Sequence, residues 1–552
     1  MARKNRRGQV PDPRDLRRRR PPALAPDHQG HGALGALRAD ARTLADPARK
    51  NQGPLRPPPS PLQGLAAHRA PRRRESRSAR AVSQIAAIAL LALRHVFRSR
   101  VVLVLAALLA AAAFLLPLGL RSDGTPEGLI RIHLVYVLGL ASFLLTLATL
   151  WSGCAAIAQE ADEKTLQLLL VKPVSRLRIW LGKWLALLLL NAGLLALVGA
   201  AAAATLHVQL RRGGFAPEAL AAARQTTLAA LETLRAPLPD VAADVRAEIE
   251  RLRAADRLPD APEAALLPSI RRTVLARRYA VAPGASRRWT FDLPAGPAAA
   301  GPLLVQFRCD SSVLGAADFD SVLDLQVGEW RATRSVRAMP GNPQTVVFPD
   351  VPAGAAQAAV EFRNRGTHGA TLFFDPADGL VLRRPAGTFA GNYLRALAQL
   401  YLRLALFAAI GVALGTLFSM PVATFLTLVL ILVLQLSGFI SAAAQVDRAT
   451  FVANVAPFGH GGHVHGDAAP PAPSQLARAA AAGLFYAYRA TYLTLRPLLE
   501  DRTLDDLATG TWLPPRALAR NAVQQGLLLP LLLGLLSAAV LRTREWALPT
   551  PS

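Results

Sequence analysis

Long apolar runs recur along this chain and constrain its fold more than any other feature. Six windows of about 20 residues carry almost no charge, and a helix of that length crosses a hydrocarbon core of roughly 30 Å. They are residues 101–120, 134–158, 184–206, 404–420, 424–444 and 526–541, the last extended by Asn521–Gln525. Single helices in water could not bury this much apolar surface. We therefore expect a polytopic membrane protein with about six transmembrane helices.

The basic residues beside these runs predict the orientation, because short cytoplasmic loops carry the Lys/Arg excess. The loop 121–131 holds Arg and acidic residues in balance, whereas basic residues precede the first run, fill the second loop and follow the last run. These are Arg94, Arg98 and Arg100, then Lys164, Lys172, Arg176, Arg178 and Lys183, then Arg542 and Arg544. We expect both termini and the loop 160–183 to be cytoplasmic. The Ala/Arg/Pro bias favours the inner membrane of a bacterium.

Residues 1–80 carry much of the net charge of +26, with 20 Lys/Arg against 6 Asp/Glu. This stretch is rich in Pro, Arg and Ala and has no hydrophobic period, which is typical of disorder. We expect a disordered basic segment, and an over-extended gene start near residue 80 is the alternative. Although such an arm can touch nucleic acid or anionic lipid, a solvated tail is the simpler interpretation; for the protein as a whole we expect membrane lipid and no nucleic acid as a partner.

Residues 207–393, after the third run, are expected to form an extracytoplasmic α+β insert. Its first part, 216–255, has helical spacing interrupted near Pro237 and Pro239. From 277 to 385 short β-like segments alternate with turns, a pattern that predicts a β-sandwich-like part. The expected strands are 287–294, 302–310, 321–330, 345–354, 358–366 and 371–379.

The rest of the chain is assigned around the apolar runs. Transmembrane helices 1–3 occupy 81–206, helices 4–5 occupy 394–444, and helix 6 with a C-terminal tail occupies 521–552. The stretch 391–403 has one apolar face and reads either as an interfacial helix or as the outer end of span four, and Arg403 favours the former. A second outside loop, 445–520, is expected to contain an amphipathic helix at 475–500.

The charged loop 160–183 lies between two apolar runs and contains residues that typically end, break and cap helices. Glu160 and Lys164 are four residues apart, a spacing that supports the end of a helix leaving the membrane. Pro173 would break the short apolar helix that follows, and Ser175 can cap the next one. The predicted element can dock on a cytoplasmic partner while its basic residues meet lipid phosphates. An ordinary positive-inside loop is the simpler alternative.

The same loop resembles the segment between the second and third spans of ABC-2-type transporter permeases. The matching positions are Glu160, Asp162, Glu163, Lys164, Thr165 and Leu166, then Pro173, Val174, Ser175 and Arg176, then Gly182 and Lys183; "ALGTLFSMPVATFL" (413–426) is similar to a later turn of the family. The resemblance implies a membrane subunit of an ABC transporter, and export is the expected direction because members of this family are mostly exporters. It also implies that the following residues couple the subunit to its ATPase: Glu160, Asp162, Glu163, Lys164, Thr165, Pro173, Ser175 and Arg176. It also implies a homodimer or heterodimer of permeases.

The chain has no Walker A motif, since "LGKW" at 181–184 lacks the upstream glycine and the Ser/Thr. We therefore expect no cofactor and no enzyme activity in this subunit, with ATP bound by a separate ABC ATPase. His460, His463 and His465 could ligate a metal, but a flexible unliganded loop is the simpler interpretation. Asn191 in the third run is expected to form an interhelical hydrogen bond.

A different class of function is a membrane-anchored extracytoplasmic binding or scaffold protein that acts through its β-sandwich. An anchor would need no structured cytoplasmic loop, which is why we favour the permease. The spans hold no carboxylate in their cores, which disfavours proton-coupled transport. The substrate and the ligand of the insert cannot be read from these residues.

Overall fold

The chain divides into two units, Met1–Arg74 and Glu75–Ser552. The computed structural model describes residues 77–98, 100–119, 123–165, 174–258, 263–293, 301–313, 318–366, 369–435, 448, 451–452, 474–499 and 502–543. The basic segment, Pro173 and the three histidines of the His-rich loop lie outside the described residues.

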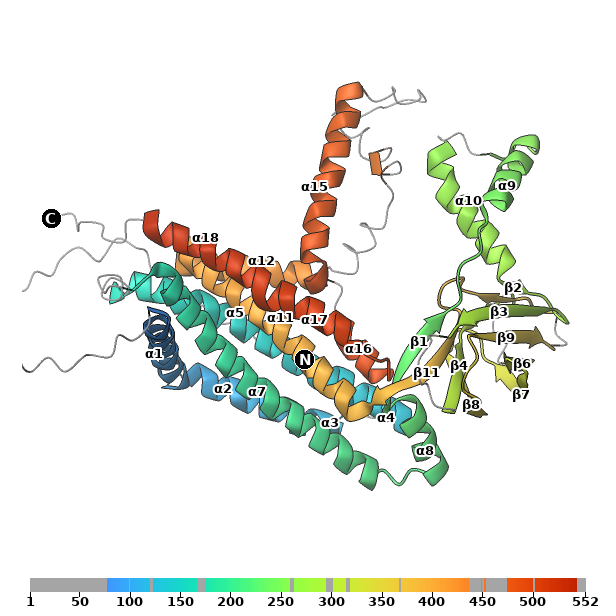
Figure 1. Ribbon diagram of the computed structural model, residues 1–552, viewed down its shortest axis with the longest axis horizontal. Coiled ribbons are helices and arrows are strands. Elements are labelled where there is room, and N and C mark those ends of the chain that lie inside the picture. Colours follow the sequence, from blue (N-terminus) through green and yellow to red (C-terminus); the bar gives the residue numbers. More distant parts are fainter. Residues whose placement is uncertain are drawn as a thin grey trace, which may run out of the picture. The chain divides into compact units, whose positions relative to one another are not determined.

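The membrane part is a helical bundle (Figure 1). Its helices are α1 (Arg77–Arg98), α2 (Arg100–Phe114), α3 (Leu116–Gly119), α4 (Pro126–His133), α5 (Gly139–Asp162), α7 (Arg176–Arg212), α11 (Phe389–Leu417), α12 (Met420–Gln435), α16 (Thr503–Ala508), α17 (Pro515–Val523) and α18 (Leu529–Thr543). Helix α15 (Gln475–Leu499) follows α12 in the chain and is drawn apart from these helices in Figure 1. Single π-helical turns, η1 (Leu134–Leu138) and η3 (Gln524–Leu528), join α4 to α5 and α17 to α18.

Four continuous helices within the described residues are long and apolar enough to cross a membrane. They are Pro126–Asp162, Arg176–Arg212, Phe389–Leu417 and Pro515–Thr543, which contain the second, third, fourth and sixth predicted runs. The first and fifth runs appear as the shorter apolar helices Leu103–Phe114 and Met420–Leu434. The protein is thus a multi-pass membrane protein, while the count of six spans stays a prediction.

The stretch 391–403 is not a separate interfacial helix, as we favoured from its sequence, but the first half of α11. No proline interrupts Phe389–Leu417, so the helix continues past Arg403. The Arg403 guanidinium lies 5.5 Å from the centre of the Phe407 ring, one turn further on. A cation held over an aromatic face is compatible with a continuous helix, and this explains how the arginine is accommodated.

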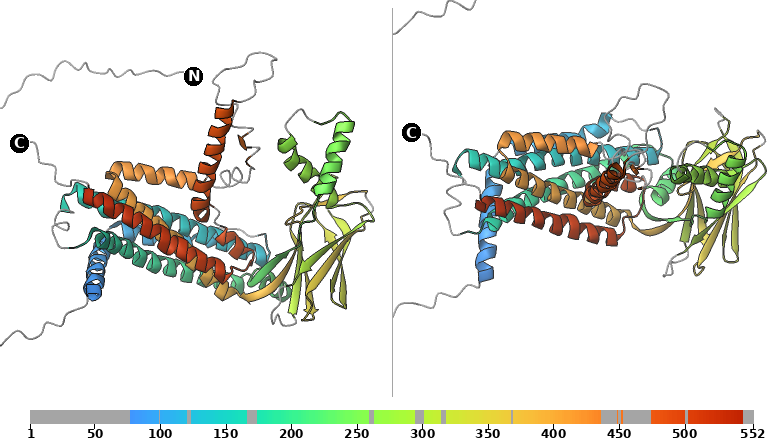
Figure 2. Two further views of the ribbon diagram at one scale, coloured as in Figure 1. Left: turned by 45° about the horizontal axis from the view of Figure 1, so that its top comes forward. Right: turned by 90° about the horizontal axis from the view of Figure 1, so that it is seen from above.

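Helices α5 and α11 touch through backbone atoms at a patch of glycines. A Cβ atom on Gly411 would lie 2.8 Å from the Leu150 carbonyl oxygen, and one on Gly415 would lie 2.2 Å from the Cys154 carbonyl oxygen. A Cβ atom on Gly153 would likewise lie 2.9 Å from the Gly411 Cα. Small residues four apart are how membrane helices approach closely. The core beside this patch gathers side chains of α5, α7, α11 and α18, and these helices lie side by side in Figure 2.

The insert (residues 214–388) separates α7 from α11. It contains helices α8 (Pro217–Thr226), α9 (Ala242–Ala254) and α10 (Glu263–Arg278) and strands β1 (Ala229–Arg235), β2 (Ala280–Val281), β3 (Ser286–Asp292), β4 (Gly301–Phe307), β5 (Cys309–Ser311), β6 (Phe319–Val327), β7 (Trp330–Ala338), β8 (Gln344–Val351), β9 (Gln357–Asn364), β10 (Leu372–Phe374) and β11 (Leu380–Thr388). The segment 216–255, expected to be helical, therefore holds two helices separated by strand β1.

Three antiparallel sheets form the β part, with strand orders β1-β11-β4-β8, β2-β10-β5 and β3-β9-β6-β7. Alternate side chains of the first and third sheets point into a common core that includes Phe307, Phe348, Phe291 and Phe362. Two sheets that share one apolar interior define a sandwich. The expected sandwich-like insert is confirmed, although β1, β2, β7 and β11 were not among the strands that we predicted.

The insert is joined to α11 without a linker. Strand β11 ends at Thr388, and α11 begins at Phe389, with the Thr388 hydroxyl accepting a hydrogen bond from the Gly391 amide at 3.2 Å. A side-chain cap of this kind satisfies an otherwise unpaired amide of the first helical turn. Strand β11 therefore passes directly into helix α11 (Figure 1).

The segment Thr509–Leu513, which precedes α17, fastens this junction. The Leu231 amide donates to the Gly510 carbonyl at 2.8 Å, and the Trp512 amide donates to the Leu231 carbonyl at 2.9 Å. The Arg383 guanidinium donates to Thr509 O and Thr511 Oγ1 at 3.1 and 2.7 Å. Burial lowers the pKa of Arg383, so these bonds are made by a largely desolvated cation. We call Thr509–Leu513 the strap.

Asn392 at the start of α11 completes the strap contact and offers a test. Its Nδ2 donates to the Thr511 carbonyl and its Oδ1 accepts from the Leu513 amide, both at 2.8 Å, and the side chain is fully buried. Asn392→Leu should cost about 2 kcal/mol or more, because two bonds are lost and two backbone groups stay buried without partners. Thermal unfolding of purified protein measures the loss, with the exposed Asn342→Leu as control. An unchanged midpoint for Asn392→Leu would contradict the role of the strap.

Candidate coupling site at the facing ends of helices α5 and α7

The end of α5 carries the acidic cluster of the loop. Asp162 is its last residue, and the Lys164 amide bonds the Ala161 carbonyl at 3.1 Å while Lys164 itself adopts a left-handed φ of 60°. The Thr165 hydroxyl donates back to the Glu160 carbonyl at 3.2 Å. Left-handed backbone at a helix end reverses the chain and satisfies its last carbonyl groups. Of the cluster, Asp162, Glu163, Lys164 and Thr165 are exposed.

Glu160 does not pair with Lys164, as its spacing suggested, but with Lys183 on α7. Glu160 Oε1 and Lys183 Nζ form an ion pair, with the Lys183 side chain only 6% exposed and the Glu160 side chain 37% exposed. The left-handed turn at Lys164 removes that residue from the face of α5 that carries Glu160. A buried ammonium needs an opposite charge, so this pair fixes the two helix ends to each other.

Helix α7 begins directly after the loop. Ser175 occupies the N-cap position with extended backbone, and the Arg178 amide bonds its carbonyl at 2.9 Å, but its side chain accepts no capping hydrogen bond. Ser175 therefore occupies the predicted N-cap position, but the predicted side-chain hydrogen bond is not formed. Arg176 is the first residue of α7 and is half-buried.

Helix α1 braces the start of α7. A Cβ atom on Gly182 would lie 2.6 Å from Ile88 Cγ2, so glycine is what allows the two helices to touch. The Arg178 guanidinium also donates to Gln84 Oε1 at 2.8 Å. Gly182 was singled out from the sequence only as a matching position, whereas Gln84 and Ile88 were missed. The amphipathic pattern of 77–98 is the signal that would have found them.

Two tryptophans on α7 connect the site to α11. Trp180 and Trp184 stack with ring centres 5.8 Å apart, and the Trp184 indole donates to the Ala405 carbonyl at 2.9 Å. Further along the same helices, the Thr149 hydroxyl of α5 donates to Asn191 Oδ1 at 3.0 Å. The expected interhelical hydrogen bond of Asn191 is confirmed. Helices α5, α7 and α11 are thus held together by interhelical hydrogen bonds as well as by packing.

The structure brings two of the predicted site residues together, because Thr165 bonds the carbonyl of Glu160 at the end of α5. Ser175 and Arg176 lie at the start of α7, whereas Pro173 lies outside the described residues. Among the residues that the structure describes, no group of three or more His, Cys, Asp or Glu side chains could hold a metal ion. The Glu160–Lys183 pair joins α5 to α7 at this site.

Comparisons with known proteins bear on this region. Residues 86–230, from α1 through the loop to the start of β1, match the family model ABC2_membrane_2, described as ABC-2 family transporter protein. The resemblance seen in the loop is thereby confirmed, and residues 86–230 are similar to ABC-2-type permeases. No curated protein matches the chain.

Solved structures match about a fifth of this chain at low identity. One is TmCBM61 in complex with β-1,4-galactotriose, with 14% identity over 19% of this chain and 67% of that one and a TM-score of 0.14. Another is a family 16 carbohydrate-binding module, with 14% identity over 19% of this chain and 73% of that one and a TM-score of 0.13. At such TM-scores the likeness carries no argument about what the insert binds.

Proposed function

We propose that this chain is the membrane subunit of an ATP-binding cassette exporter that is driven by a separate ATPase. The observation that carries the proposal is the ABC-2 family match across α5, the loop and α7, where the acidic end of α5 is joined to α7 by the Glu160–Lys183 pair. The absence of a Walker A motif from the sequence supports a nucleotide site on another polypeptide. Two permease copies, identical or different, would enclose the pathway in a bacterial inner membrane with both termini inside.

In this proposal the exposed residues at the end of α5 meet the ATPase, and ATP binding there displaces the loop. Because Glu160 is paired with Lys183, the ends of α5 and α7 move together. The glycine contact of α5 with Gly411 and Gly415 carries the displacement to α11. Since β11 runs into α11 and the strap fastens that junction, the insert would follow the movement. Rigid elements in direct contact can transmit such a movement.

Stimulation of ATP hydrolysis tests the function. The chain in lipid nanodiscs is mixed with an ABC ATPase that co-purifies with it from native membranes, and hydrolysis is compared with that of the ATPase alone. We expect the chain to raise the rate, and we expect replacement of residues 160–165 by a Gly/Ser linker to remove the increase. A rate that the chain leaves unchanged, with the two proteins present in equal amounts, would contradict the proposal.

A further inference from the structure

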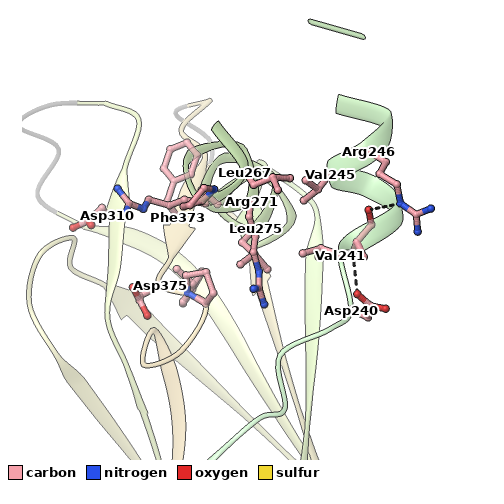
Figure 3. A pocket seen from close by; sticks show the side chains of 16 residues that line it. Asp240, Val241, Val245, Arg246, Leu267, Arg271, Leu275, Asp310, Phe373 and Asp375 are labelled. Atoms are coloured by element: carbon pink, nitrogen blue, oxygen red, sulfur yellow. Dashed lines mark hydrogen bonds between the residues drawn. The ribbon is translucent and has the colours of Figure 1, made fainter. Parts of the chain in front are cut away.

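A cleft of about 1110 Å³ opens in the insert between the α9–α10 hairpin and the sheet of β2, β10 and β5. Figure 3 shows its lining, with Val241 and Val245 on one helix, Leu267, Arg271 and Leu275 on the other, and Asp310 and Phe373 from the strands. Ligand clefts of this size are mostly apolar with a few polar groups that fix orientation. The α9–α10 hairpin was not predicted, so the sequence analysis missed this cleft.

Apolar side chains line the cleft both where it is buried and where it is exposed. Val241, Val245 and Phe374 are buried at its base. At the rim Leu267 is 40% exposed and Phe373 is 39% exposed, although both are large apolar side chains. Apolar side chains left in water around a concave surface mark a place where an apolar ligand gains by binding. The elongated arrangement along two helices suits a chain-like ligand.

Two arginines of α10 supply free positive charge in this cleft. Arg271 and Arg272 are exposed, and neither makes an ion pair or hydrogen bond with a residue that the structure describes. The arginines six residues further on are committed instead, Arg277 to Glu248 at 3.3 Å and Arg278 to Asp244 at 2.9 Å. The hairpin is therefore held closed by its own ion pairs without using Arg271 or Arg272.

The carboxylates that line the cleft are less available. Asp240 Oδ1 accepts from the Ala242 amide at 2.9 Å, a contact marked in Figure 3, and so caps α9. Asp375 Oδ1 accepts from the Ala377 and Asp378 amides at 2.8 and 2.9 Å. Asp310 alone of the three makes no such side-chain bond among the described residues. The amide bonds leave the charges of Asp240 and Asp375 in place, but Arg271 and Arg272 keep guanidinium donors that no described group engages, and these donors suit an anionic head group.

We propose that the cleft binds a single-chain anionic amphiphile, a long-chain carboxylate or a similar lipid anion. Its acyl chain would lie along Val241, Val245, Leu275 and Phe373, and its head group would accept charge-assisted hydrogen bonds from Arg271 and Arg272. A peptide fits less well, because the edge strands β2 and β5 span only Ala280–Val281 and Cys309–Ser311 and offer few main-chain partners. This site does not depend on the proposed coupling to an ATPase.

Photo-cross-linking of the full chain tests the site. The protein in nanodiscs of phosphatidylcholine is incubated with a diazirine-labelled palmitate, irradiated and digested, and the labelled peptides are identified by mass spectrometry. We expect labels in α9, in α10 and in residues 372–376. The double variant Arg271→Glu/Arg272→Glu should lower this labelling about tenfold, because a charge-assisted pair at the head group is replaced by repulsion.

Three comparisons make the result decisive. Arg257→Glu changes the same charge at an exposed position just after α9, outside the cleft lining, and should leave labelling unchanged. The uncharged diazirine-labelled hexadecanol should label the cleft less than the acid does, and Arg271→Gln/Arg272→Gln should give an intermediate loss. Labels confined to the membrane helices, equal labelling by acid and alcohol, or labelling that survives both double variants would each overturn the proposal.

Discussion

Gly415→Leu should abolish the folded membrane bundle. A Cβ atom at this position would lie 2.2 Å from the Cys154 carbonyl oxygen and 3.0 Å from its Cα, so the obstacle is the backbone of α5 and no side-chain rotation relieves it. Helices α5 and α11 would have to separate over the whole glycine patch, because a close-packed interface does not yield locally. Fluorescence-detected size-exclusion chromatography measures the effect as loss of the monodisperse peak.

A matched control lies on the neighbouring span. Gly193 of α7 is exposed and a Cβ atom there meets no heavy atom within 4 Å. Gly193→Leu replaces glycine with a strong helix former in the same membrane, so we expect a normal peak. A monodisperse Gly415→Leu protein with the same thermal midpoint as wild type would show that the α5–α11 contact is not as close as described.

Glu160→Gln should destabilise the protein strongly by leaving the Lys183 ammonium without a counter-charge. Removing one partner of a buried ion pair costs about 3–5 kcal/mol. The lower end of that range applies here because Glu160 is 37% exposed whereas Lys183 is 6% exposed. Asp162→Asn, which removes an exposed carboxylate two residues away, should change the thermal midpoint little and serves as control.

The double variant Glu160→Gln/Lys183→Met separates stability from coupling. Replacing both charges of a buried pair with neutral groups is often close to neutral for stability, so the thermal midpoint should recover. We expect ATPase stimulation to stay low in the double variant, because the link between α5 and α7 is absent while the fold is intact. If stimulation recovers together with stability, the pair has only a structural role.

The membrane helices could be predicted because their signal is local. An uncharged run of sufficient length predicts a span wherever it occurs, and 184–206 lies inside α7 as expected. The helix ends were harder to predict, since they depend on contacts between helices. The span α4–α5 starts at Pro126, not at the apolar residue 134, because the Thr125 hydroxyl caps it at 3.0 Å. His133 near its start bonds the Ala202 carbonyl of α7 at 2.9 Å.

Strand β1 shows why the insert was only partly predicted. Its sequence, "AALETLR", favours a helix by propensity, yet it pairs along its length with β11, more than 140 residues further on. The Arg384 guanidinium bonds Glu232 across the two strands at 2.7 Å, and Leu231 is fully buried. Cross-strand partners so distant in sequence leave no local pattern, and tertiary packing overrides the propensity.

The coupling site was predicted as a set of residues but not as a geometry. The family pattern identified Glu160 and Lys183 separately, and residue spacing then suggested Lys164 as the partner of Glu160. The left-handed φ of Lys164, which turns it away, is not readable from a lysine. The pairing with Lys183 required the antiparallel packing of α5 against α7, which only the structure supplies.

Co-purification with the ATPase tests the central claim most directly. The tagged full chain is extracted from its native membranes in mild detergent, and the proteins that accompany it are identified by mass spectrometry. We predict a stoichiometric nucleotide-binding subunit that is lost when residues 160–176 are replaced by a Gly/Ser linker. If only extracytoplasmic proteins accompany the chain, and the replacement changes nothing, the β-sandwich insert is the working part and the permease account is contradicted.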